Sequence, residues 1–147
     1  MRTRLLAGNW KLNKTIAEAR SLVEELRQRV EGIRDVEVVV CPPFTALAAV
    51  AEAARGSQVQ VGAQDMFWKE SGAYTGEVAP GMLREAGATY VIVGHSERRG
   101  RFGKPEFTAA QARVFGDNDE TVNAKVAAAL AAGLTPIVCC GETLAER

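Results

Sequence analysis

The only histidine of the chain, His95, stands directly after an apolar run in the sequence TYVIVGHSERR. An imidazole can move a proton or donate a hydrogen bond near neutral pH, so a histidine at the end of a buried strand is a candidate for chemistry. Proton transfer usually needs a second group, and Glu97 follows two residues later. The first question is therefore which residue works with His95.

Polar residues also follow the other apolar runs. In parallel α/β folds, ligands bind at the carboxyl ends of the strands. We therefore expect the polar residues just beyond the runs to meet at one face of the molecule if the strands are parallel. These residues are Asn9, Lys11, Gln64, Asp65, His95, Ser96, Glu97 and Glu142.

Lys11 and its neighbours indicate a kind of ligand. A lysine ammonium can hold a phosphate or a developing enolate oxygen, and Asn9 offers an amide donor beside it. Glu97 could pair with Lys11 and orient it. With His95 as a proton shuttle or hydrogen-bond donor, the set suits a small anionic carbonyl compound.

Each of these residues also has a purely structural interpretation. His95 fits a capping or hydrogen-bonded structural residue, Lys11 a solvated surface charge, and Asn9 a turn cap. Glu97, with the two arginines that follow it, fits a solvated run of charge. Spacing alone leaves both interpretations open.

Strand-like and helix-like segments alternate along the chain. Apolar runs predict strands at 4–10, 36–43, 59–65, 89–94 and 135–141. Apolar residues at helical spacing predict helices at 15–30, 44–56, 80–86 and 120–133. Thr15 and Glu18 fit a capping box at the start of the first helix. Segment 66–81 is predicted to be a long loop, and segment 95–119 to be irregular with one short helix.

This alternation predicts βαβ units with right-handed crossovers and one parallel sheet. The predicted strands are apolar without clean alternation, as expected where both faces of a sheet are buried. The predicted fold class is therefore α/β. No linker or low-complexity segment divides the 147 residues, so we expect a single domain.

Composition excludes several classes of partner. Eighteen basic residues balance eighteen acidic residues, so the chain lacks the charge excess that binds nucleic acid or an anionic membrane. The sequence has no apolar run of about 18 residues and no signal-peptide pattern, which predicts neither a membrane span nor secretion. Three cysteines in apolar runs, Cys41, Cys139 and Cys140, indicate reduced thiols and a cytoplasmic location.

Several stretches, taken together, closely resemble the triosephosphate isomerase family. They are AGNWKLN at 7–13, VGAQDMFWKESGAYTGEVAPGML at 61–83, GATYVIVGHSERR at 87–99 and GLTPIVCCGETLAER at 133–147. The match runs in order over essentially the whole chain. The resemblance implies a (β/α)8 TIM barrel that interconverts dihydroxyacetone phosphate and glyceraldehyde 3-phosphate in glycolysis and gluconeogenesis, with no cofactor and no metal.

The resemblance also implies roles for the residues singled out above, through a mechanism already known for this family. Asn9 and Lys11 would bind the substrate, and Lys11 would stabilise charge on the enediolate and the phosphate. His95 would act as a neutral electrophile, kept neutral by the positive end of a helix that starts after it. Glu97 would be a partner of Lys11. Thr75, at the tip of the family's dimer loop GAYTG, would approach Lys11 and His95 of a partner subunit.

Two features depart from the family pattern. Segment 100–119 is longer than in the shortest family versions and resembles a tolerated loop insertion. More seriously, an eight-unit barrel needs about 250 residues. Residues 1–147 supply a single incomplete TIM-barrel domain of four βα units, a fifth strand and the start of the next helix. The glutamate base after the sixth strand and the glycine-rich phosphate loops after the last two strands have no counterpart, so the partner of His95 is expected outside this chain.

Three alternatives follow. The chain is an N-terminal half that becomes active only with a complementing C-terminal half. Or it is a half-barrel scaffold without isomerase activity, whose open sheet edges drive homo-oligomerisation. Or another carboxylate replaces the base, which makes an oligomer weakly active. Because losing a general base reduces the rate by ~10²–10⁴-fold, we expect the isolated chain to be inactive or very weak.

Overall fold

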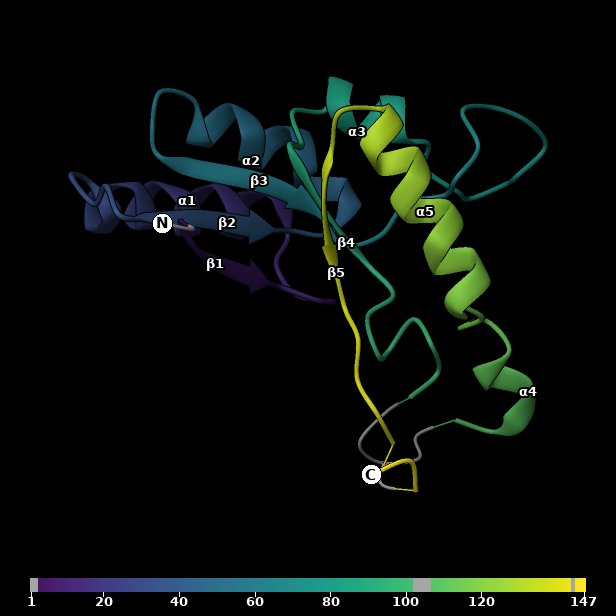
Figure 1. Cartoon of the computed structure of the whole chain (residues 1–147). Helices are drawn as coiled ribbons and strands as arrows, with labels where there is room; N and C mark the ends of the chain where they lie inside the picture. Colours follow the sequence, from purple (N-terminus) through teal and green to yellow (C-terminus); the bar gives the residue numbers. More distant parts are fainter. Residues whose placement is uncertain (1–2, 102–106, 144) are drawn as a thin grey trace.

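The computed structural model describes residues 3–101, 107–143 and 145–147. Five parallel strands form one sheet, and their order in the sheet is their order in the sequence (Figure 1). The strands are β1 (Arg4–Asn9), β2 (Val36–Cys41), β3 (Val59–Ala63), β4 (Tyr90–Val93) and β5 (Thr135–Val138). The predicted α/β class and parallel sheet are confirmed, and each predicted strand is present with slightly shorter bounds.

Helices connect the strands. They are α1 (Ile16–Val30), the 3-10 turn η1 (Phe44–Ala46), α2 (Leu47–Ala54), α3 (Pro80–Glu85), α4 (Ala109–Ala112) and α5 (Asp119–Ala131). The helix predicted at 44–56 begins as a 3-10 turn after Pro43, and no side chain caps that turn. The single short helix predicted within 95–119 is α4, and residues 102–106 of that segment lie outside the described ranges.

Helix α1 begins at the capping box that the sequence predicts. The Thr15 backbone N–H donates to the Glu18 carboxylate at 2.8 Å, and the Glu18 N–H donates to the Thr15 hydroxyl at 3.4 Å. These bonds satisfy donors that have no partner inside the helix. Hydrogen bonds from Thr15, the backbone one first, also lower the pKa of Glu18.

The helices cover one face of the sheet. Each strand joins the sheet at the same edge, next to the strand that precedes it in the sequence. Because the crossovers are right-handed, every connecting helix then lies on the same face of the sheet. The larger core cluster lies there, where Val40, Val61 and Val91 pack with residues of α1, α2 and α5, such as Val23 and Val50. This core holds the ends of the strands, and so the polar residues beyond them, in fixed positions.

The opposite face carries a smaller cluster that contains no helical residue. Val39, Cys41 and Ile92 are buried there, with Tyr90, Ile137 and Cys139 partly buried around them. A Cβ atom at Gly62 would lie 2.8 Å from Cys41 Sγ, so only glycine lets these side chains approach one another. Burial raises the pKa of the Cys41 thiol to about 12, which leaves it unreactive at neutral pH.

Both outer strands of the sheet have one unpaired edge, as the sequence predicts. Among the residues that the structure describes, β1 pairs only with β2, and β5 pairs only with β4. Leu6 on β1 is 63 % exposed and Val138 on β5 is 49 % exposed. On the helix-covered face, Val40, Val91 and Val93 are buried in the core. No helix in the described part of the chain has the length and apolar character needed to cross a bilayer.

Candidate active site

The polar residues predicted to converge do meet at the carboxyl ends of the strands. They line a cavity of about 260 Å³ together with parts of the loop before α3. The members from the predicted set are Asn9, Lys11, Gln64, Asp65, His95 and Glu97. Ser96 and Glu142 instead line a neighbouring cavity of about 640 Å³, which His95 also borders.

Lys11 is held in an unusual backbone conformation at this cavity. Its φ is 55°, in the left-handed region that residues other than glycine rarely adopt. The Lys11 N–H donates to Asn9 Oδ1 at 3.0 Å, and Gln64 Nε2 donates to the Lys11 carbonyl at 2.9 Å. The Gln64 amide also donates to the Cys41 carbonyl at 2.8 Å, which ties the Lys11 turn to the end of β2.

The side chain of Lys11 pairs with Glu97 as the sequence predicts. Lys11 Nζ donates to Glu97 Oε1 at 2.8 Å, with the two side chains 49 % and 37 % exposed. An exposed pair of this kind contributes little to stability. Its effect is to hold an ammonium group at the cavity, where two further donor hydrogens remain for an anion.

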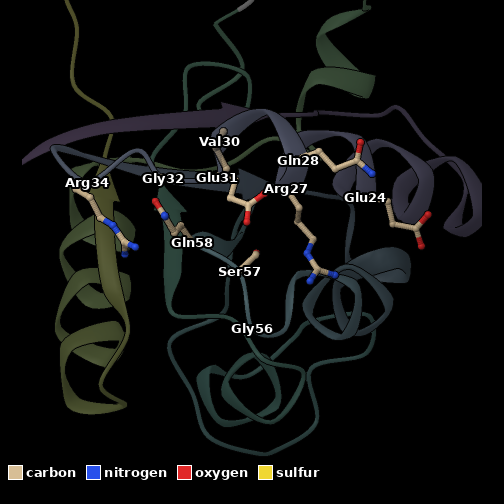
Figure 2. A pocket seen from close by; sticks show the side chains of 10 residues that line it. All are labelled: Glu24, Arg27, Gln28, Val30, Glu31, Gly32, Arg34, Gly56, Ser57 and Gln58. Carbon is tan, nitrogen blue, oxygen red and sulfur yellow. The ribbon is translucent and has the colours of Figure 1, made fainter.

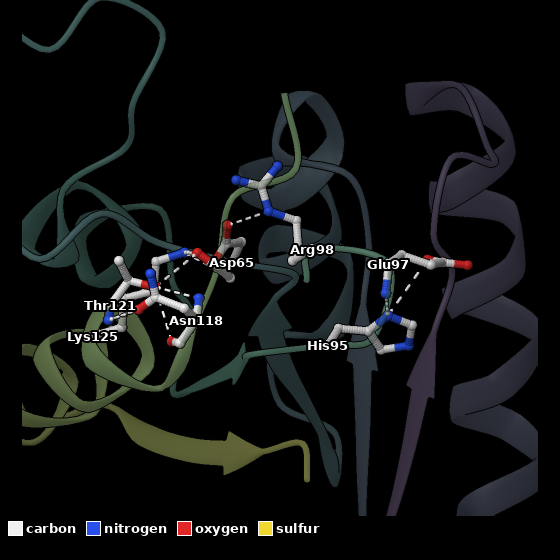
Figure 3. A network of polar contacts seen from close by, with 8 residues as sticks. Asp65, His95, Glu97, Arg98, Asn118, Thr121 and Lys125 are labelled. Atoms are coloured by element: carbon white, nitrogen blue, oxygen red, sulfur yellow. Dashed lines mark hydrogen bonds and ion pairs between the residues drawn. The ribbon is translucent and has the colours of Figure 1, made fainter. Parts of the chain in front are cut away.

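His95 has a defined hydrogen-bond direction. The Glu97 backbone N–H donates to His95 Nδ1 at 3.2 Å, so Nδ1 is the acceptor and the proton of the neutral ring lies on Nε2 (Figure 3). Glu97 Oε2 is 3.5 Å from the same Nδ1, which is too long for a hydrogen bond. The Nε2–H of His95 is therefore the donor that remains for a ligand.

The helix expected directly after His95 is not present, and that expectation was wrong. Residues 96–100 form a hydrogen-bonded turn, in which the Arg99 N–H donates to the His95 carbonyl at 3.1 Å. Gly100 has a φ of 69°, and the Arg101 N–H donates to the Ser96 carbonyl at 2.8 Å, which closes the turn. The donor that fixes His95 is thus the single N–H of Glu97, without the dipole of a helix.

A group of charges that is largely buried except for Arg98 anchors this turn. Lys125 of α5 is only 3 % exposed, and its Nζ lies 2.8 Å from Asp65 Oδ1 and 2.7 Å from Asp117 Oδ1 (Figure 3). Arg98 Nε is 2.8 Å from Asp65 Oδ2, in an ion pair without hydrogen-bond geometry. Two cations balance two carboxylates, as burial of charge requires. We call these four residues the Lys125 network.

Sequence reasoning missed the Lys125 network. Its structural interpretation of Arg98 and Arg99 was a solvated run of charge, whereas Arg99 Nε donates to the Gly94 carbonyl at 2.8 Å. A signal for Lys125 was present, because it lies three residues after Val122 on the buried stripe of α5. A charged residue on such a stripe indicates a buried ion pair.

Gly94 sets the direction in which the chain leaves β4. Its φ is 70°, and a Cβ atom there would lie 2.7 Å from Val122 Cγ2. Both the left-handed backbone and the contact require glycine. The residue that follows, His95, is thereby directed to the cavity.

Thr75 is exposed and does not line the cavity of its own chain. It lies in the loop between β3 and α3, whose aromatic residues pack together. The Phe67 ring centroid lies 4.1 Å from that of Trp68 and 4.6 Å from that of Tyr74. The next residues, from Gly76 to Val78, do line the cavity, so the tip bearing Thr75 projects beyond it. Its role toward a partner subunit stays a prediction.

A larger cavity of about 830 Å³ lies at the opposite end of the sheet, between the C-terminal half of α1 with the loop after it and residues 56–58, which follow α2 (Figure 2). Glu24, Arg27, Glu31 and Arg34 contribute its charges. Arg27 is already occupied, since its Nη1 donates to the Ala53 carbonyl at 2.7 Å. None of the residues predicted for chemistry lies there, so the smaller cavity is the better candidate despite its size.

The smaller cavity gathers donors rather than metal ligands. It offers the Lys11 ammonium, the His95 Nε2–H and the Asn9 amide. Within the described ranges, no three His, Cys, Asp or Glu side chains are grouped to hold a metal ion. The arrangement suits an anionic ligand whose carbonyl oxygen accepts a hydrogen bond from the imidazole.

The comparisons with known proteins agree with this geometry. The sequence model of the family "Triosephosphate isomerase" matches residues 4–147. The triosephosphate isomerase of Pelobacter propionicus is 54 % identical over 147 residues, and that of Moorella thermoacetica is 55 % identical over the same length. Each alignment covers all of this chain and 53 % of the relative, so the chain spans about half the length of these curated relatives.

A solved structure gives the same result for the fold. The crystal structure of triosephosphate isomerase from Bartonella henselae superposes with a TM-score of 0.83 at 37 % sequence identity. The superposition covers 99 % of this chain and 55 % of that one, so the five strands are part of a TIM barrel. The family model, the two relatives and the superposition each cover all or nearly all of the chain. The chain therefore belongs to the triosephosphate isomerase family.

Proposed function

We propose that this chain supplies the substrate-binding and carbonyl-polarising part of a triosephosphate isomerase site. The reaction would be the interconversion of dihydroxyacetone phosphate and glyceraldehyde 3-phosphate. The observation that carries the proposal is the bond from the Glu97 N–H to His95 Nδ1, which leaves Nε2–H as the free donor of a neutral His95 at the cavity that Lys11 also lines.

In this proposal His95 donates Nε2–H to the substrate carbonyl oxygen and moves protons between the two oxygens of the enediolate. A neutral imidazole suits this step, because the imidazolate that forms when Nε2 gives its proton to one enediolate oxygen becomes neutral again when Nε2 takes the proton of the other oxygen. Lys11 stabilises the negative charge that develops on the enediolate and the charge of the phosphate. Asn9, whose Oδ1 is occupied by the Lys11 N–H, presents its amide hydrogens to the substrate.

Proton abstraction from carbon needs a base that these residues do not provide. The family resemblance places that base, a glutamate, after a sixth strand, and the chain matches 53 % of its relatives' length. Loss of a general base reduces the rate by ~10²–10⁴-fold. The 147 residues alone are therefore expected to turn over substrate very weakly or not at all.

The partner that we propose is a chain or segment with the remaining strands of the barrel. The free edges of β1 and β5 and the exposed Leu6 and Val138 are what such a segment would cover. Thr75 would act in a further contact, between two subunits, where it would reach the site of the partner. A cytoplasmic location fits the three free thiols of the described structure.

A complementation assay tests the proposal. The purified chain is mixed with the part of the Moorella thermoacetica relative that it does not cover, and isomerase turnover is followed by a coupled assay. We expect turnover only in the mixture, and a loss of at least ~10²-fold with His95→Gln. Turnover that persists in the His95→Gln mixture would refute the assigned role of His95.

A second candidate function is a half-barrel scaffold that self-associates without catalysis, which the unpaired edges of β1 and β5 favour. Sedimentation of the chain alone distinguishes the two. A stable oligomer that excludes the complementing segment and shows no turnover would favour the scaffold. A chain that takes up the segment and gains turnover would favour the isomerase.

A further inference from the structure

A polar layer lies on the helix-free face of the sheet, at the amino ends of the strands. Residues alternate between faces along a strand, so Glu37 shares its face with Val39 and Cys41 of the smaller cluster. The register places Gly62 beside Tyr90 on that same face, and a Cβ atom at Gly62 would lie 3.2 Å from Tyr90 Cβ. Glu37 and Tyr90 thus both belong to the surface that would become the interior of a closed barrel.

The two residues are joined directly. The Tyr90 hydroxyl donates to Glu37 Oε2 at 2.5 Å. This hydrogen bond, with smaller contributions from burial and from the Glu37 charge, raises the pKa of Tyr90 to about 12. The phenol therefore stays neutral at physiological pH, and it solvates the carboxylate without cancelling its charge.

No cation neutralises Glu37 in the part of the chain that the structure describes. The ion pairs among the described residues do not include Glu37. Arg34 lines the same cavity, of about 520 Å³, but forms no ion pair with the carboxylate. The other polar groups of the layer, such as Gln60 and Thr135, are uncharged. In this open sheet Glu37 is exposed, so water solvates it.

Closing the barrel would change that environment. Strands added beyond β1 and β5 would bring this face into a barrel interior, where an unpaired carboxylate is strongly unfavourable. The hydrogen bond from the Tyr90 phenol does not balance a full charge. The segment that carries the remaining strands must therefore place a positive charge at the same level along the barrel axis as Glu37.

We propose that Glu37 is the docking point for an arginine guanidinium of the segment that completes the barrel. This inference rests on the complementing partner of the proposed function and names the side chain by which that partner is recognised. Glu37 Oε2 already accepts a hydrogen bond from the Tyr90 hydroxyl. Two N–H groups of a planar guanidinium can therefore donate to Oε1 and to the remaining lone pair of Oε2. A guanidinium is also less strongly hydrated than an ammonium, and so is easier to bury.

The test measures binding rather than catalysis. The chain and its Glu37→Gln variant are titrated calorimetrically with the uncovered part of the Moorella thermoacetica relative. Glu25→Gln removes one carboxylate from the exposed surface of α1 and serves as the control for net charge. We expect Glu37→Gln to raise the dissociation constant by at least about 100-fold, because the arginine is left buried without a counterion. Glu25→Gln should change it by less than about threefold.

A double-mutant cycle identifies the partner residue. Each arginine of the partner segment that falls in a strand-like run is changed to methionine, and each such segment is titrated against the unsubstituted chain and against its Glu37→Gln variant. For one of these arginines, the substitution should raise the dissociation constant for the unsubstituted chain by at least about 100-fold. The same substitution should raise the dissociation constant for the Glu37→Gln variant by less than about tenfold. Tyr90→Phe should weaken binding by less than about tenfold, since the charge pair remains.

Two results would overturn the inference. One is equal or tighter binding of Glu37→Gln, which would show that the carboxylate is not paired in the complex. The other is an additive cycle for every arginine. Turnover is recorded in the same mixtures, so the two proposals can fail separately. If binding depends on the Glu37 charge but no turnover appears, the isomerase function is refuted and the Glu37 pairing stands. If turnover appears but Glu37→Gln does not change binding, the isomerase function stands and the Glu37 pairing is refuted.

Discussion

The backbone N–H of Glu97 donates to Nδ1 of His95 at 3.2 Å, while the carboxylate of Glu97 accepts from Lys11 at 2.8 Å. One residue thus fixes the imidazole through its main chain and the ammonium through its side chain. The division matters because the main-chain donor is present whatever the side chain is. It follows that the tautomer of His95 and the position of Lys11 can be changed independently.

The tautomer of His95 gives the first prediction. The chain has a single histidine, so nitrogen NMR of the labelled chain reports it without ambiguity. At pH above the titration of the ring, Nε2 should carry the proton and Nδ1 should be unprotonated. Glu97→Gln keeps the backbone N–H and should leave the tautomer unchanged. A proton on Nδ1 in the unsubstituted chain would contradict the assigned hydrogen bond.

The Lys125 network gives a prediction about stability. Lys125→Met removes one buried cation and leaves Asp65 and Asp117 without it, so the free energy of unfolding should fall by ~3–5 kcal/mol. Lys69→Met, at an exposed position of the loop before α3, is the matched control and should change it by no more than ~0.5 kcal/mol. Urea unfolding of the three chains measures both values. Equal midpoints for the two variants would mean that the network does not stabilise the fold.

The comparison between sequence and structure depends on the range of the interactions involved. Helix α1 could be predicted to its first residue, because Thr15 and Glu18 act on their own neighbours. The meeting of Asn9, Lys11 and His95 also followed from the sequence, because parallel strands place their carboxyl ends together. These features need only local pattern and chain direction.

The features that were missed depend on contacts between distant segments. Arg98 fits a solvated charge in the sequence, and Lys125 was not singled out, because Asp65 lies between them only in the folded chain. The expected helix after His95 is a single turn, which ends at Gly100 in a left-handed backbone conformation that the residue type alone did not require. The family resemblance supplied the residue roles, and it did not supply these contacts.

The capping box of α1 gives a prediction with a defined pH dependence. Thr15→Ala removes the cap and should lower the free energy of unfolding by about 1 kcal/mol at pH 7. The pKa of Glu18 is lowered in the folded chain, so its contribution is present above the unfolded value of 4.5 and is lost as the pH falls through the folded value. The difference between the two chains should therefore shrink in acid. Thermal unfolding at pH 7 and at pH 3 checks this, and a constant difference would argue against the reciprocal bond.

The bond between Tyr90 and Glu37 gives a prediction at the other end of the pH scale. The pKa of Tyr90 is raised from 10.0 to about 12, so the neutral phenol is favoured in the folded chain. The stability that it contributes is fully present below pH 10 and is lost as the pH rises from about 10 to about 12. Tyr90→Phe removes this ionisation and should flatten the decline in stability over that range, while Tyr74→Phe, at the other tyrosine of the chain, should leave the decline in place. Urea midpoints measured at intervals from pH 8 upward make the comparison, and parallel curves for Tyr90→Phe and the unsubstituted chain would show that the phenol does not depend on the Glu37 carboxylate.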